Sequence, residues 1–275
     1  MITDETTSRY AQAGDLRLHY NEVGSGGTPV VCLHDGAPAA SAWGNFGQNV
    51  GPLAQQFRVL LVDMPQFGKS EKIIIQTGRS TYISRVLCAL MDTLDIRKLH
   101  LIGFSLGGQV AIKFAIDFPE RVDKLLVIGS TPVPFSLFCP VPLEGPKITR
   151  QYYGGEGPTA PKMRQILETM VYDPSVIADE MVQARYLASI DPEVVRVMTA
   201  PISVREDLSD QLDRVQARSL LVWGTDDRFG ALDVGLLMLR KFQDAQMHLF
   251  SRCGHWAQLE RADEFNRLAL DFLAN

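Results

Sequence analysis

The 275-residue sequence has few of the features that mark secreted, membrane-spanning and nucleic-acid-binding proteins. Its four cysteines are scattered without a CxxC pair, which argues against a disulfide framework and a zinc site. A formal net charge of -5 offers no concentrated basic surface for phosphates or anionic lipids. No run is long and apolar enough to span a membrane, and the opening residues, MITDE, do not resemble a secretory signal. We therefore expect a cytoplasmic protein with neither nucleic-acid nor membrane partners.

Short apolar, β-branched runs alternate with helical patterns along most of the chain. These runs predict strands near residues 16–23, 30–34, 58–63, 99–103, 125–129, 220–224 and 247–250. The alternation predicts an α/β fold with a mostly parallel sheet that helices cover on both faces. A hydrophobic content of 46% suits one such domain with a sizeable buried core.

The alternation of strands and helices stops after residue 129 and resumes near residue 220. The intervening stretch opens with several prolines, which cannot donate hydrogen bonds within a sheet, and continues with apolar residues at helical spacing. We interpret residues 134–212 as a helical cap inserted between two parts of an α/β core, residues 1–133 and 213–275.

A Gly-x-Ser-x-Gly motif lies between a predicted strand and a predicted helix. It reads GFSLG at 103–107, has Ser105 at its centre and precedes a helical pattern over 109–118. The glycines Gly103 and Gly107 fit a tight turn in which a Cβ atom would clash. Such a turn would expose the Ser105 hydroxyl beside a helix N-terminus, which favours developing negative charge. We predict that Ser105 is a nucleophile; the alternative is a serine that only caps the helix.

A serine nucleophile requires a histidine base and a carboxylate that orients the base, and this type of fold places them in the chain order Ser, Asp or Glu, His. Of the five histidines, only His255 follows Ser105 in a loop, between the last predicted strand and the last helix. Two aspartates, Asp226 and Asp227, follow the strand at 220–224, and either could orient the base. The Gly-x-x-Asp spacing favours Asp227 and leaves Asp226 as a turn carboxylate.

The oxyanion formed in acyl transfer needs two backbone N–H donors. We expect one from Leu106, directly after the nucleophile, and the other from Gly36, in the loop that follows the strand at 30–34. An ordinary Gly-Pro turn is the alternative explanation for Gly36.

Several segments resemble the meta-cleavage product hydrolases, which are α/β-hydrolases that cleave carbon-carbon bonds in bacterial degradation of aromatic and steroid rings. These segments are WGTDDRF at 223–229, CGHWAQ at 253–258, and shorter matches around Trp43, Gly68 and Met170. The resemblance implies hydrolysis of a small-molecule substrate, a 2-hydroxy-6-oxo-2,4-dienoate, to a 2-hydroxypenta-2,4-dienoate and a carboxylic acid. It implies catalysis by Ser105, Asp227 and His255 without a metal or organic cofactor. It also implies a homo-oligomer, a dimer or larger.

The same resemblance implies four substrate-binding residues. Arg185 in the cap would bind the substrate carboxylate, and Asn45 would lie near the dienoate end. Trp256 and Phe104 would form part of the pocket wall. A guanidinium can hold a carboxylate through two parallel hydrogen bonds, although an arginine on a helix surface or a tryptophan in a core needs no ligand.

The sequence also departs from the family pattern. The loop that usually reads His-Gly-x-Gly-Pro-Gly is HDGAPA at 34–39, so any position there that needs a positive φ should be strained. We expect Asp35 to face away from this loop, because its charge would disfavour an oxyanion. Phe104 stands where the family commonly has Asn, so one polar contact to the dienoate should be lost. Two alternatives remain: an ester or lactone hydrolase of the same fold and a non-catalytic ligand-binding protein, although the latter has no need of the Ser-Asp-His set.

Overall fold

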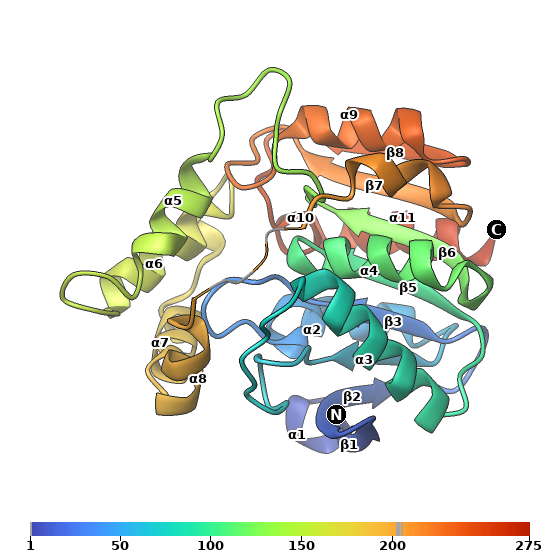
Figure 1. Ribbon diagram of the computed structural model, residues 1–275, viewed down its shortest axis with the longest axis horizontal. Helices are drawn as coiled ribbons and strands as arrows, with labels where there is room; N and C mark the ends of the chain where they lie inside the picture. Colours follow the sequence, from blue (N-terminus) through green and yellow to red (C-terminus); the bar gives the residue numbers. More distant parts are fainter. Residues whose placement is uncertain (1, 202–203, 205) are drawn as a thin grey trace.

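The centre of the molecule is an eight-stranded sheet with the strand order β1-β2-β4-β3-β5-β6-β7-β8 (Figure 1). The computed structural model describes residues 2–201, 204 and 206–275. β2 runs antiparallel to β1 and β4, and the strands from β4 to β8 are parallel to one another. The strands are β1 (Ser8–Ala13), β2 (Leu16–Val23), β3 (Val30–Leu33), β4 (Val59–Val62), β5 (Leu99–Phe104), β6 (Val122–Ile128), β7 (Arg218–Gly224) and β8 (Ala245–Phe250). All seven predicted strands are confirmed, and β1 at the sheet edge was not predicted.

Helices cover both faces of the sheet, as predicted (Figure 1). One face carries α3 (Arg79–Thr93), α4 (Leu106–Asp117) and α9 (Leu232–Lys241). The other face carries α2 (Ala42–Leu53), α10 (Ala257–Glu260) and α11 (Ala262–Ala274). Other short elements of the described residues are α1 (Asp4–Thr7) and the 3-10 turns Pro119–Arg121 and Ser209–Arg214.

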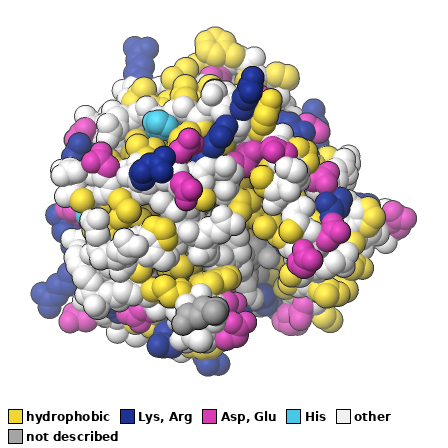
Figure 2. Space-filling model, turned by 180° about the vertical axis from the view of Figure 1, so that it is seen from behind, with side chains coloured by type: hydrophobic (Ala, Val, Ile, Leu, Met, Phe, Trp, Pro, Cys, Tyr) yellow, Lys and Arg dark blue, Asp and Glu magenta, His cyan; other side chains and the backbone are white. Residues whose placement is uncertain are grey.

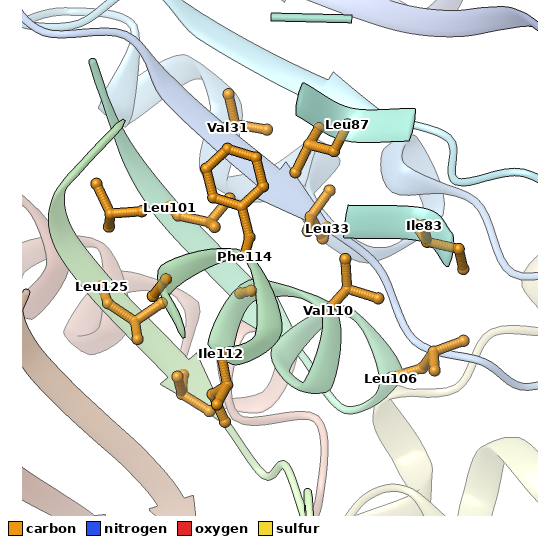
Figure 3. Close-up of a cluster of buried hydrophobic side chains, with 14 of the residues drawn as sticks. Val31, Leu33, Ile83, Leu87, Leu101, Leu106, Val110, Ile112, Phe114 and Leu125 are labelled. Atoms are coloured by element: carbon orange, nitrogen blue, oxygen red, sulfur yellow. The ribbon is translucent and has the colours of Figure 1, made fainter. Parts of the chain in front are cut away.

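The two hydrophobic cores follow from the alternation of side chains along each strand. Val31 and Leu33 of β3 pack in the same core as Val110 and Phe114 of α4, and Figure 3 shows these side chains together. The other two residues of β3, Val30 and Cys32, belong to the core on the opposite face. Because β3, β4 and β5 are buried along their whole length, their sequences are almost continuously apolar.

Among the described residues, four α-helices lie between β6 and β7, beside the layers of the sheet domain (Figure 1). They are α5 (Glu144–Gln151), α6 (Ala160–Thr169), α7 (Asp179–Ser189) and α8 (Pro192–Met198), with a 3-10 turn at Pro174–Val176. The proline-rich stretch 130–143 that precedes them has neither helix nor strand, as predicted. The boundaries 134–212 of a separate cap stay a prediction, and residues 202, 203 and 205 of that range lie outside the described residues.

The surface carries charges of both signs. Acidic and basic side chains are interspersed on the face shown in Figure 2. In the part of the chain that the structure describes, no helix has both the length and the apolar character needed to cross a membrane.

Candidate active site

Ser105 lies in strained backbone at the junction of β5 and α4. Its φ of 55° and ψ of -115° belong to a region that residues other than glycine rarely adopt. The Ser105 N–H donates to the Ile128 carbonyl at 2.9 Å, and the Ser130 hydroxyl donates to the Ser105 carbonyl at 2.8 Å. These bonds to the end of β6 and the residues after it hold the turn in its unusual conformation.

Two glycines of this turn have no room for a side chain, which confirms the steric prediction. A Cβ atom on Gly107 would lie 2.2 Å from the Leu33 carbonyl oxygen. A Cβ atom on Gly103 would lie 2.5 Å from the Gly107 carbonyl oxygen. Both obstacles are backbone atoms, which cannot swing aside as a side chain could. Glycine at 107 therefore lets the turn pack against β3, and glycine at 103 lets the start of α4 pack against the end of β5.

His255 and Asp227 form a buried pair at the ends of β8 and β7. Nδ1 of His255 lies 2.8 Å from Oδ2 of Asp227, and each side chain is 1% exposed. Oδ1 of Asp227 accepts the N–H groups of Phe229 at 2.7 Å and Gly230 at 2.8 Å. The carboxylate is thus fixed on one side by the backbone, and it fixes the imidazole on the other.

The other imidazole nitrogen, Nε2 of His255, has no hydrogen-bond partner among the described residues. Ser105 is therefore not bonded to His255, although such bonds are often long before substrate binds. Asp226 is exposed and accepts the Thr225 hydroxyl at 2.8 Å. The structure thus brings Asp227, rather than Asp226, to His255.

Aromatic rings enclose the imidazole of His255. The Phe229 ring stacks on it with a centroid distance of 5.0 Å, and the Phe104 ring lies at 4.8 Å. Phe104 is fully buried and also stacks on Trp256, at 6.4 Å. Phe104 therefore contributes an apolar ring next to the imidazole and no polar group to a ligand.

The two residues expected to supply oxyanion donors are neighbours in space. A Cβ atom on Gly36 would lie 2.9 Å from Cδ2 of Leu106. Neither the Gly36 N–H nor the Leu106 N–H donates a hydrogen bond to any residue that the structure describes. Ala39, further along the same loop, has a φ of 54°, so the prediction of strain in this loop is confirmed.

Arg185 of α7 forms a buried ion pair with Asp35 of the loop at 34–39. Nη2 of Arg185 lies 3.0 and 3.2 Å from the two carboxylate oxygens of Asp35, and Nε donates to the Pro38 carbonyl at 3.0 Å. The Arg185 and Asp35 side chains are 8% and 1% exposed. Asp35 also accepts the Ala37 N–H at 2.6 Å. The expectation that Asp35 faces away from its loop is wrong. Its carboxylate is buried, accepts an N–H group of the same loop and pairs with the Arg185 guanidinium.

Asn45 completes the surroundings of Asp35. The hydroxyl of Ser41 caps α2 by accepting the Gly44 N–H at 3.0 Å, which places Asn45 in the first turn of that helix. Oδ1 of Asn45 accepts the Asp35 N–H at 2.7 Å. Burial raises the pKa of the Asp35 carboxyl, but the charge of Arg185 and the hydrogen bonds outweigh this effect and leave the pKa below its ordinary value. Asp35 therefore remains negatively charged at neutral pH.

Comparison with known proteins assigns the chain to a family. A family model described as alpha/beta hydrolase fold matches residues 29–262. The chain is 40% identical over 284 residues to the 2-hydroxy-6-oxo-6-phenylhexa-2,4-dienoate hydrolase of Comamonas testosteroni, which covers 99% of this chain and 98% of that protein. The chain belongs to the α/β-hydrolase fold family and, within it, to the meta-cleavage product hydrolases.

Further relatives of this α/β-hydrolase agree with the assignment. The 2-hydroxy-6-oxononadienedioate/2-hydroxy-6-oxononatrienedioate hydrolase of Paraburkholderia xenovorans (strain LB400) is also 40% identical, over 100% of this chain and 98% of that protein. A solved meta-cleavage product hydrolase from Pseudomonas fluorescens IP01 has a TM-score of 0.87 and 29% identity, with 97% of this chain and 98% of that chain covered. The fold class and the family predicted from the sequence are confirmed.

Proposed function

We propose that this α/β-hydrolase cleaves the carbon-carbon bond of a 2-hydroxy-6-oxo-2,4-dienoate to give a 2-hydroxypenta-2,4-dienoate and a carboxylic acid. The observation that carries the proposal is the buried His255–Asp227 pair, which lies near a serine in a strained turn, in a chain 40% identical to hydrolases named for such dienoates. We infer that the enzyme acts on this small molecule in the cytoplasm, as a homo-oligomer.

The chemistry begins at the dienol end of the substrate. The dienol first becomes a keto form, so that the departing carbon can leave with its electron pair as a stabilised dienolate. Ser105, or a water molecule in its place, then attacks the remaining ketone while Nε2 of His255 takes the proton. The N–H groups of Gly36 and Leu106 stabilise the oxyanion that forms.

The carbon-carbon bond then breaks, and the dienolate takes a proton from the imidazolium of His255. Asp227 holds the imidazole tautomer and stabilises the imidazolium without accepting the proton. Where Ser105 is the nucleophile, water then hydrolyses the acyl group left on it, which releases the carboxylic acid. Where water attacks instead, the carboxylic acid forms directly as the carbon-carbon bond breaks. At the dienoate end of the substrate, Arg185 and Asn45 make the polar contacts, and Phe104 and Trp256 form the apolar wall.

One assay tests the proposal directly. The protein is mixed with a yellow 2-hydroxy-6-oxo-6-phenylhexa-2,4-dienoate, and the loss of its absorbance is followed beside hydrolysis of a p-nitrophenyl ester. We expect rapid bleaching that disappears in Ser105→Ala. Ester turnover without bleaching would contradict the proposal.

Hydrolysis of an ester or lactone is the second candidate function. The observation in its favour is the Asp35–Arg185 ion pair, because a substrate of this kind needs no site for an anion. The ester half of the same assay distinguishes the two functions.

A further inference from the structure

Side chains from three separate elements meet around Asp35. Arg185 comes from α7 and pairs with the Asp35 carboxylate at 3.0 Å, and Asn45 comes from α2 and accepts the Asp35 N–H at 2.7 Å. The Trp256 ring, at the start of α10, lies 5.9 Å from Cζ of Arg185. We call Asp35, Arg185, Asn45 and Trp256 the Asp35 cluster.

The Asp35 cluster contacts the candidate active site through one aromatic ring, and two of its residues line a groove. The Phe104 ring contacts both Trp256 of the cluster and His255, so one aromatic ring separates the cluster from the imidazole. A groove of about 320 Å³ reaches the cluster, and its lining includes Trp43, Ala184, Arg185 and Trp256. The Asp35 cluster therefore adjoins both the candidate active site and the groove.

The Asp35–Arg185 ion pair itself carries no net charge. The Arg185 guanidinium is a cation, and two of its nitrogens already donate to Asp35 and Pro38. A substrate carboxylate that approached Arg185 would also approach the Asp35 carboxylate. Like charges repel strongly in a site shielded from water. The ion pair thus removes the preference for an anion that a lone arginine would provide.

Two neutral N–H donors of the cluster lack acceptors. Nδ2 of Asn45 and Nε1 of Trp256 are buried and have no hydrogen-bond partner among the described residues. Buried donors without partners are uncommon because they are costly, so these two suit a bound acceptor. A neutral carbonyl satisfies them without bringing a charge next to Asp35. The Asp35 carboxylate can in turn accept an N–H from a carboxamide.

We infer that Asp35 is a specificity-determining residue that makes this hydrolase prefer substrates whose carboxyl end is uncharged, as an amide or an ester, over the free dienoate. This inference rests on the proposed function and refines its substrate. The carbon-carbon bond that breaks and the roles of Ser105, His255 and Asp227 stay the same.

The test compares three versions of one substrate: 2-hydroxy-6-oxo-6-phenylhexa-2,4-dienoate, its methyl ester and its primary amide. The readout is the ratio of kcat/KM for the acid to kcat/KM for each uncharged compound. We expect the wild-type enzyme to prefer the amide or the ester, and Asp35→Asn to shift the ratio towards the acid by about tenfold or more. The methyl ester has no N–H group and the primary amide has one. A higher kcat/KM for the amide than for the methyl ester would therefore show that an N–H donated to Asp35 contributes.

Removal of one partner of a buried ion pair destabilises a fold, so the variants are chosen with that effect in mind. Asp35→Asn has the same shape as the original side chain and keeps an acceptor for the Ala37 N–H. The ratio of two rates from one preparation does not depend on the folded fraction. The control is Asp117→Asn, which removes a carboxylate paired with Lys113 at 2.7 Å near the far end of α4. This control changes the net charge equally and should leave the ratio unchanged.

Two outcomes would overturn the inference and leave the proposed function standing: a wild-type preference for the acid, or a ratio that Asp35→Asn does not change. Failure to cleave any of the three compounds would instead overturn the proposed function. Calorimetric titration of Ser105→Ala protein with the same compounds requires no turnover. Tighter binding of the amide or ester than of the acid there supports the inference, and tighter binding of the acid overturns it.

Discussion

The hydroxyl of Ser8 lies 2.9 Å from Nε2 of His19, whose Nδ1 lies 2.8 Å from Oδ2 of Asp63. This Ser-His-Asp chain is more completely hydrogen-bonded than the set around Ser105, where no bond joins the serine to His255. Ser8, however, begins an edge strand with an ordinary extended backbone, at φ -61° and ψ 131°. It has neither a strained turn nor a following helix N-terminus to favour negative charge. Hydrogen bonds alone therefore do not identify the nucleophile.

We expect a fluorophosphonate probe to label Ser105 and not Ser8, because only Ser105 combines the strained turn with candidate oxyanion donors. Peptide mass spectrometry locates the label. Ser105→Ala should abolish labelling and turnover, and Ser8→Ala should retain both. A label on Ser8 in the wild-type protein would contradict the assignment of the nucleophile.

Asp227→Asn should lower kcat by about 10³–10⁴-fold, because an amide no longer holds the His255 tautomer or stabilises the imidazolium. The neighbouring change, Asp226→Asn, is the matched control and should leave kcat unchanged, since Asp226 is exposed and contacts Thr225. Steady-state kinetics on both variants, together with melting temperatures, separates a catalytic loss from unfolding. Equal losses of kcat in the two variants would contradict the assignment of Asp227, rather than Asp226, as the residue that orients His255.

The sequence predicts the features that local patterns determine. The buried strands are apolar throughout, and the turn around Ser105 has glycines where backbone atoms come within 2.5 Å of a Cβ position. The edge strand β1 (SRYAQA) was missed because it is short, largely exposed and mixed in polarity. β1 forms a strand because it pairs with β2, and the residues of β1 alone do not show this pairing.

The ion pair around Asp35 marks the limit of prediction from the sequence. The acidic residue was visible in the loop at 34–39, and Arg185 was a candidate for anion binding. The two residues are 150 positions apart in the chain, so their contact depends on how α7 packs over the loop. An acidic residue in place of a glycine near a predicted anion site was the only available signal.

Gly107→Ala should prevent the turn around Ser105 from forming, because the new Cβ would lie 2.2 Å from the Leu33 carbonyl oxygen. We expect a loss of activity and a fall in the free energy of unfolding of more than about 2 kcal/mol. The control is Gly51→Ala in α2, where no atom outside the adjoining residues and the helix backbone lies within 4 Å of the added Cβ. That variant should keep its activity and change the free energy of unfolding by less than about 1 kcal/mol, since the helix preference of alanine is offset by the following Pro52. Urea unfolding and the bleaching assay measure both effects, and an active, fully stable Gly107→Ala protein would contradict the account of the turn.

His100 should make the protein less stable in mild acid. It lies in β5, is 3% exposed and packs edge-on against Phe57. Burial lowers the pKa of its imidazole from 6.5 to about 4, and the nearby Asp123 only partly opposes this effect. Between pH 6.5 and pH 4 the unfolded chain therefore binds a proton that the native protein does not bind, so stability falls as the pH falls through this window and levels off below it.

His100→Gln and His100→Phe remove this titration, so their free energies of unfolding should decline less than that of the wild type between pH 7 and pH 4.5. We expect a difference of roughly 1–2 kcal/mol after allowance for partial solvent screening. Urea unfolding at pH 7, 5.5 and 4.5 provides the comparison. The two variants differ in packing and therefore in absolute stability, but they should share one pH dependence, because neither replacement can take up a proton. Parallel curves for the wild type and both variants would show that His100 does not resist protonation in the native state.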